Sequence, residues 1–136
     1  MQRLVAIALV GLAACGGPRI VVYTPLEKKT GLEQGKLYAA AEGTLLDRGY
    51  LLETRDEKSG RLETEPRTLL GSAIGRSKFR YSWKVSTADG TLRIELSCKE
   101  QGGLGDSGDC SKEAPEKLVG EQNQIAEQTL REARGQ

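Results

Sequence analysis

The sequence contains no histidine, and only 4% of its residues are aromatic. The absence of histidine removes the commonest general base of enzymes, the usual serine–histidine triads and histidine-ligated zinc. Carboxylate pairs, Asp56 with Glu57 and Glu63 with Glu65, stand among polar residues. This setting indicates exposed surface charges rather than the paired acids of a glycosidase. We therefore expect a non-enzymatic protein with no catalytic residues, no metal site and no cofactor.

The chain also lacks an excess of charge of either sign. It has 20 lysines and arginines against 19 aspartates and glutamates, a formal net charge of +1. A nucleic-acid-binding domain carries a basic surplus, so no nucleic-acid partner is expected. Charges of both signs are intermixed, which is typical of a solvated surface around a small core. The length of 136 residues fits a single domain.

A long hydrophobic run is missing as well. The apolar stretch from Leu4 to Ala14 is far shorter than the roughly 20 residues that a membrane-spanning helix needs. It follows the basic residue Arg3 and ends in small residues, as a secretory signal peptide does. The segment Leu12-Ala13-Ala14-Cys15 at its end resembles the bacterial lipobox.

The lipobox resemblance implies that residues 1–14 are removed and that the Cys15 thiol carries diacylglycerol. Stable attachment to a membrane takes two lipid signals, which a di- or triacylated cysteine supplies. The alternative is an ordinary secretory signal with a coincidental cysteine. Gly16, in place of aspartate, implies export to the outer membrane by the sorting rule of the resembling family. We expect residues 15–19 to be a lipidated tether that holds the domain close to the outer membrane, facing the periplasm.

Two further cysteines, Cys98 and Cys110, form an even pair. Disulfides persist in exported proteins, so we expect these two to be bonded. Two free thiols are the alternative, because sequence separation does not establish the geometry that a disulfide requires.

Local patterns predict an α+β fold: an antiparallel sheet of about five strands with two helices packed on one face, in a single domain over residues 20–136. The segment "IVVYT" is typical of a first strand, and Thr30 with Glu33 matches a capping box for a helix that ends at Gly49. Two strands are expected around the turn at residues 57–60, and a longer hairpin around Asp89-Gly90. A second helix is expected over residues 113–134.

Three segments allow a functional and a structural interpretation. Phe79, Tyr81 and Trp83 share one strand face, which suits a stacking platform or, as we favour, a face packed on helices. The glycine-rich loop before Cys110 holds Asp106 and Asp109, which suit either a calcium site or a disulfide-closed loop. The segment "GSAIGRSK" departs from a phosphate-binding loop in its spacing and in having arginine where that motif needs lysine.

The segment "LLDRGYLLETRDEKSGRLETEP", the strands "FRYSWKV" and "LRIEL" and the terminal helix together resemble domains of the NlpB/BamC accessory lipoproteins of outer-membrane β-barrel assembly. This resemblance implies a non-enzymatic periplasmic module that binds other envelope proteins, although those proteins have two such domains. We expect a membrane-anchored envelope lipoprotein with a protein-binding or structural role. The alternative is a small-molecule or ion-binding lipoprotein that uses a cavity between sheet and helices or the acidic glycine-rich loop.

Overall fold

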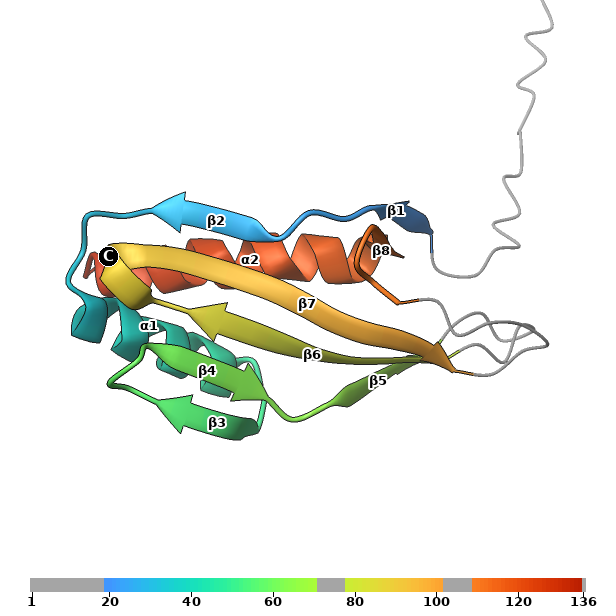
Figure 1. Cartoon of the computed structure of the whole chain (residues 1–136), viewed down its shortest axis with the longest axis horizontal. Coiled ribbons are helices and arrows are strands. Elements are labelled where there is room, and N and C mark those ends of the chain that lie inside the picture. The colour runs from blue at the N-terminus through green and yellow to red at the C-terminus, as the bar shows by residue number, and fades with distance from the viewer. Residues whose placement is uncertain (1–18, 71–77, 102–108, 136) are drawn as a thin grey trace, which may run out of the picture.

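The computed structural model describes residues 19–70, 78–101 and 109–135. Two helices lie against one face of an antiparallel sheet, as the sequence predicts (Figure 1). The helices are α1 (Gln34–Asp47) and α2 (Glu116–Ala133). The strands are β1 (Ile20–Val22), β2 (Leu26–Lys29), β3 (Leu52–Asp56), β4 (Arg61–Thr64), β5 (Arg67–Leu70), β6 (Lys78–Ser86), β7 (Thr91–Gln101) and β8 (Glu113–Pro115).

The main sheet has six strands, one more than expected. Its order is β2-β7-β6-β4-β3, and β5 also pairs with β6, beyond β4 on the same edge. The strand predicted at residues 20–24 is not part of this sheet: β1 pairs with β8 in a separate two-stranded sheet, with Val21 opposite Ala114. Pro25 separates β1 from β2, and proline has no N–H to give to a ladder. The chain resumes pairing at Leu26, opposite Ile94 of β7.

The hairpin of β6 and β7 is the centre of the sheet and confirms the prediction from Asp89-Gly90. Both residues have positive φ, 57° and 69°, and the N–H of Thr91 bonds to the carbonyl of Ala88. A two-residue turn of this kind matches the twist of the strands and needs residues that tolerate positive φ. The turn fixes the register of the nine residue pairs between β6 and β7, one of which is Lys84 opposite Glu95.

β4 and β5 follow one another along the same edge of β6 with a break at Pro66. Proline has no N–H to give to a ladder, so β4 ends at Thr64, and the new strand that starts at Arg67 was not expected. At the break, the backbone N–H of Trp83 donates to the side-chain oxygen of Thr64 at 2.8 Å. The buried donor is therefore satisfied although the backbone ladder is interrupted.

α1 ends as predicted and begins differently. At its end, Gly49 has φ of 81°, its N–H bonds to the carbonyl of Leu46, and that of Tyr50 bonds to Leu45, the pattern of a Schellman motif. The predicted capping box is wrong, because α1 begins at Gln34 with no side-chain cap. The Thr30 hydroxyl instead donates to the carbonyl of Gly90 at 2.7 Å and so ties this loop to the β6–β7 turn.

α2 begins at Glu116 rather than at Glu113. Residues 113–115 form β8, because their backbone pairs with β1, and Pro115 stands just before the first turn. The buried residues of α2 recur with the 3.6-residue period of a helix and so form one face. Its members are Leu118, Gln122, Ile125, Ala126, Thr129, Leu130 and Ala133.

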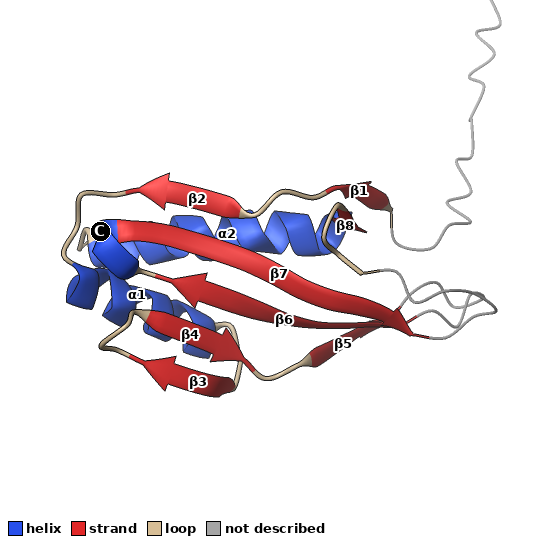
Figure 2. Ribbon diagram, viewed as in Figure 1, coloured by secondary structure: helices blue, strands red, loops and turns tan. Residues whose placement is uncertain are grey.

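Side chains fill the layer between sheet and helices, with both helices behind the sheet in the view of Figure 2. Phe79, Tyr81 and Trp83 are all buried there, which settles the aromatic strand face as core. The Tyr81 and Trp83 rings meet edge to face with centroids 6.3 Å apart, a favourable aromatic geometry. Neither helix of the described chain is long and apolar enough to span a bilayer.

Candidate interaction surface on the open sheet face

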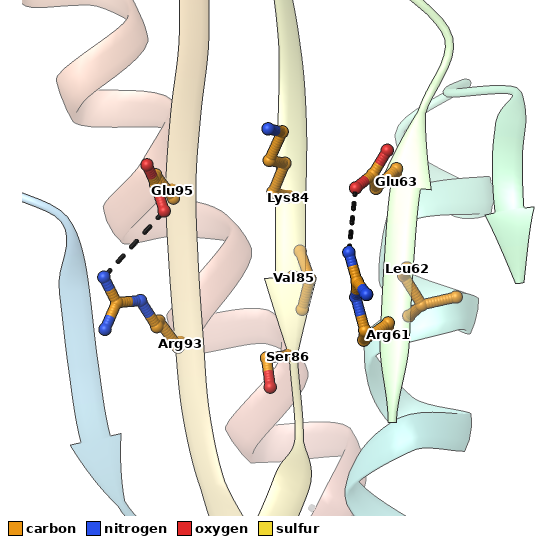
Figure 3. Close-up of a pocket in the computed structure, with 8 residues that line it drawn as sticks. All are labelled: Arg61, Leu62, Glu63, Lys84, Val85, Ser86, Arg93 and Glu95. Carbon is orange, nitrogen blue, oxygen red and sulfur yellow. Dashed lines mark ion pairs between the residues drawn. The ribbon is translucent and has the colours of Figure 1, made fainter. Parts of the chain in front are cut away.

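The sheet face away from the helices is charged, and no helix or strand of the described residues covers it. Alternation along β6 and β7 sends apolar side chains into the core and polar ones outward. In the half of the sheet near the β6–β7 turn, a shallow depression of about 170 Å³ lies between β4, β6 and β7 (Figure 3). We call the six outward residues that line it the charged cluster: Arg61, Glu63, Lys84, Ser86, Arg93 and Glu95.

Opposite charges are matched within the charged cluster. Arg61 lies 3.6 Å from Glu63, its neighbour two residues along β4. Arg93 lies 3.9 Å from Glu95 and 3.8 Å from Glu27 on β2. These side chains are mostly half exposed, so each ion pair contributes little to stability, typically below about 1 kcal/mol. Their arrangement is better suited to recognition than to holding the fold together.

Lys84 is the central cation of the charged cluster. Its backbone lies opposite Glu63 of β4 on one side and Glu95 of β7 on the other. Figure 3 shows the Lys84 side chain between these two glutamates. It is exposed, and no carboxylate of the described chain lies within ion-pairing distance of its amine. Lys84 is therefore available to an acidic partner.

The depression does not suit a small molecule. Pockets that enclose drug-sized ligands have volumes of roughly 300–1,000 Å³ and largely apolar walls. Here the rim is charged, and the apolar residues Leu62 and Val85 have their side chains buried in the core. A flat, mixed-charge face of this kind can select a protein surface of complementary charge pattern.

The disulfide predicted between Cys98 and Cys110 is present, with their Cα atoms 5.2 Å apart. It lies at the other end of β7 beside a second shallow depression of about 180 Å³. Asp109, at the rim, accepts hydrogen bonds from the backbone and hydroxyl of Ser111 at 3.1 and 2.6 Å. These bonds lower the pKa of the Asp109 carboxyl.

The other sequence-derived sites lie largely outside the described residues. Cys15, Asp106 and residues 71–77 of the segment "GSAIGRSK" lie outside the described residues. Glu63 belongs to the charged cluster on β4, whereas Glu65 is exposed beyond the end of that strand. Within the described residues, no group of three or more acidic, cysteine or histidine side chains is placed to hold a metal ion.

Sequence reasoning missed a buried polar chain behind the sheet. Trp83 Nε1 donates to the Tyr50 hydroxyl at 2.9 Å, and that hydroxyl donates to Glu121 of α2 at 2.5 Å. Burial, and next the bond to Glu121, raise the pKa of Tyr50. The Arg67 guanidinium stacks 3.9 Å above the Tyr50 ring and donates to the carbonyl of Gly49. The only sequence signal was a tyrosine directly after a helix-stop glycine.

Comparison with known proteins gives little to add to this geometry. No known protein-family model matches the chain, and no curated protein does. Among solved structures, the chain is similar to a DUF4468 family protein from Bacteroides ovatus, with a TM-score of 0.47 and 15% sequence identity over 84% of this chain and 80% of that one.

Proposed function

We propose that this chain is a lipid-anchored envelope protein of the outer membrane, facing the periplasm, whose single domain binds other envelope proteins through the charged cluster. The anchor is Cys15, on the basis of the lipobox resemblance of residues 12–15. The domain is a binding module and not an enzyme.

The observation that carries the proposal is the open sheet face. The two described helices cover one face of the sheet. On the other face Lys84 lies between Glu63 and Glu95, and each of these glutamates also pairs with an arginine of its own strand. Charges in this arrangement favour a partner of complementary pattern and disfavour others. The Cys98–Cys110 bond supports the envelope location, because disulfides persist in oxidising compartments.

The alternative of a small-molecule carrier has less support. It depends on a cavity between sheet and helices, and in the described part of the chain buried side chains fill that layer. The acidic glycine-rich loop offers Asp109 alone among the described residues, already bonded to Ser111.

The anchor is tested by the intact mass of the protein purified from the membrane fraction. The expected result is loss of residues 1–14 and an added mass of at least one diacylglycerol. A mature chain that starts elsewhere, or that has an unmodified Cys15, would contradict the anchor.

The binding surface is tested by chemical cross-linking in intact cells, followed by purification of the native protein. Lys84→Glu reverses the central charge, so it should abolish the cross-linked partners that the wild-type chain gives. The matched control is Lys36→Glu, an exposed lysine on α1 in the helical layer. Equal partner recovery from the two variants would refute a role for the charged cluster.

A further inference from the structure

The two ends of the open sheet face differ in how charges meet across β6 and β7. Near the β6–β7 turn, Lys84 lies opposite Glu95. Near the other end, Arg80 lies directly opposite Lys99, so two cations face one another across the strands. Lys78 follows two residues away on the same face of β6.

These three cations are exposed and poorly balanced. No ion pair within the described residues involves Lys78, Arg80 or Lys99. The neighbouring acid is Asp109, whose backbone bridges to Lys99 and whose carboxylate accepts two hydrogen bonds from Ser111. Like charges directly opposite in an antiparallel pair destabilise a sheet. The pair of Arg80 and Lys99 therefore points to an anionic partner rather than to a structural role.

The same end of the domain is where the chain enters the fold. Figure 1 shows β1 and β8 at the end where β5 and β7 finish and β6 begins. Ile20 and Val22 of β1, the first residues after the expected tether, are 46% and 79% exposed. Leu70 of β5 is 69% exposed and lies opposite Lys78. Exposed aliphatic side chains, and cations with no ion pair among the described residues, thus occur at the same end of the domain as the expected tether.

We infer that this tether-end surface, made of Ile20, Val22, Leu70, Lys78, Arg80 and Lys99, binds the anionic headgroups of the membrane that anchors the protein. The inference rests on the proposed lipid anchor. Cations gain from contact with lipid phosphates, and aliphatic side chains gain from entering the headgroup boundary. With only four residues between Cys15 and Ile20, five extended residue steps keep Ile20 within about 18 Å of the bilayer. The domain then stands on this end, and the charged cluster faces the periplasm.

Two lysines at the opposite end of the sheet serve as a control for the cations of the tether-end surface. Lys28 and Lys29 of β2 are also exposed strand lysines, but Lys29 lies opposite Thr91, beside the β6–β7 turn. The inference predicts that lipid contact involves Arg80 and Lys99 and leaves Lys28 and Lys29 in solvent.

The test uses the protein as purified from membranes, reconstituted either in vesicles of zwitterionic lipid alone or in vesicles that also contain an anionic phospholipid. Amine labelling followed by peptide mapping gives the reactivity of each lysine. Each cation near an anionic surface contributes about a fivefold gain in binding. Labelling of Lys78 and Lys99 should therefore fall about fivefold or more in anionic vesicles and recover at high salt, while Lys28, Lys36 and Lys58 change little.

Two double variants, each of which removes two positive charges, test whether the position of the cations matters. Arg80→Gln/Lys99→Gln should abolish the protection of Lys78, whereas Lys28→Gln/Lys29→Gln should leave it intact. The melting temperature of the first variant should be equal to or above that of the wild type, because a repulsive pair is removed.

The outcomes separate this inference from the anchor. A lipidated protein whose Lys78 and Lys99 react equally in both vesicles overturns the inference and leaves the anchor standing. Protection in native membranes but not in protein-free anionic vesicles also overturns it, because the occupant is then a protein. If the mass shows no lipid, the anchor fails, and flotation of the protein with anionic vesicles then tests the tether-end surface separately. Vesicle binding by the wild type that is lost in Arg80→Gln/Lys99→Gln supports the inference. Absence of vesicle binding by the wild type overturns it.

Discussion

The indole nitrogen of Trp83 donates its hydrogen bond to the Tyr50 hydroxyl, which joins the central strand of the sheet to the residue that follows α1. The same hydroxyl donates to Glu121 of α2. Three elements that are distant in sequence are therefore joined at one oxygen atom. Both Trp83 and Tyr50 are almost fully buried, so each of these bonds replaces water that is no longer accessible.

Removal of that oxygen should destabilise the protein. Tyr50→Phe leaves the Trp83 N–H without its acceptor in the core, and an unsatisfied buried donor costs about 1–3 kcal/mol. Urea denaturation monitored by tryptophan fluorescence measures the loss. Tyr38→Phe is the control, because the described residues offer the Tyr38 hydroxyl no hydrogen-bond partner. Equal loss in the two variants would contradict the role of Tyr50.

The protein should lose stability at alkaline pH. Burial raises the pKa of Tyr23, Tyr38 and Tyr50 above the ordinary tyrosine value of 10.0. Above that value the unfolded chain releases protons that the native state retains, so these tyrosines leave the free energy of unfolding unchanged below it and lower it above it. Each such tyrosine contributes a slope of about 1.4 kcal/mol per pH unit. For Tyr50→Phe, the slope of the free energy of unfolding against pH, measured by urea denaturation, should be smaller by the contribution of one tyrosine. An unchanged slope would show that Tyr50 does not contribute.

The disulfide should stabilise the domain without affecting the proposed lipid anchor. Cys98→Ser/Cys110→Ser removes the bond between the end of β7 and the segment before β8, which should cost about 2–4 kcal/mol. The melting temperature should then fall by about ten degrees or more. Non-reducing peptide mapping of the wild-type protein comes first, since two free thiols there would refute the bond. A double variant that melts with the wild type would show that the bond contributes no stability.

Two glycines should respond to alanine in opposite directions. Gly90 has φ of 69°, and a Cβ there would lie 2.6 Å from the carbonyl oxygen of Leu32, so Gly90→Ala should destabilise by about 1–3 kcal/mol. Gly120 lies inside α2 with nothing near its Cβ position, so Gly120→Ala should stabilise by about 0.5–1 kcal/mol. Thermal unfolding of both variants measures the contrast. A stable Gly90→Ala protein would mean that the Leu32 segment is free to move away.

The features that the sequence predicted correctly are set by neighbouring residues. Asp89-Gly90 specifies its turn, Gly49 ends α1, and strict alternation sends Phe79, Tyr81 and Trp83 to one face. The anchor at Cys15 stays a prediction, because the structure does not describe that residue.

The features that it missed depend on contacts between distant segments. Thr30 has the spacing of a cap, but the carbonyl of Gly90 offers its hydroxyl a partner across the fold. Residues 113–115 follow a helical pattern, yet they pair with β1 from the other end of the chain. The charged cluster required the strand order, since Glu63 becomes a neighbour of Lys84 only when β4 pairs with β6. No local pattern specifies such pairings.

The pairing of β1 with β8 also determines the order in which the chain can fold. Tyr23, directly after β1, bonds to Gln122 of α2, 99 residues further along. A chain made from its N-terminus therefore completes β2 to β7 before the partners of β1 exist, and closing so long a loop is the late step.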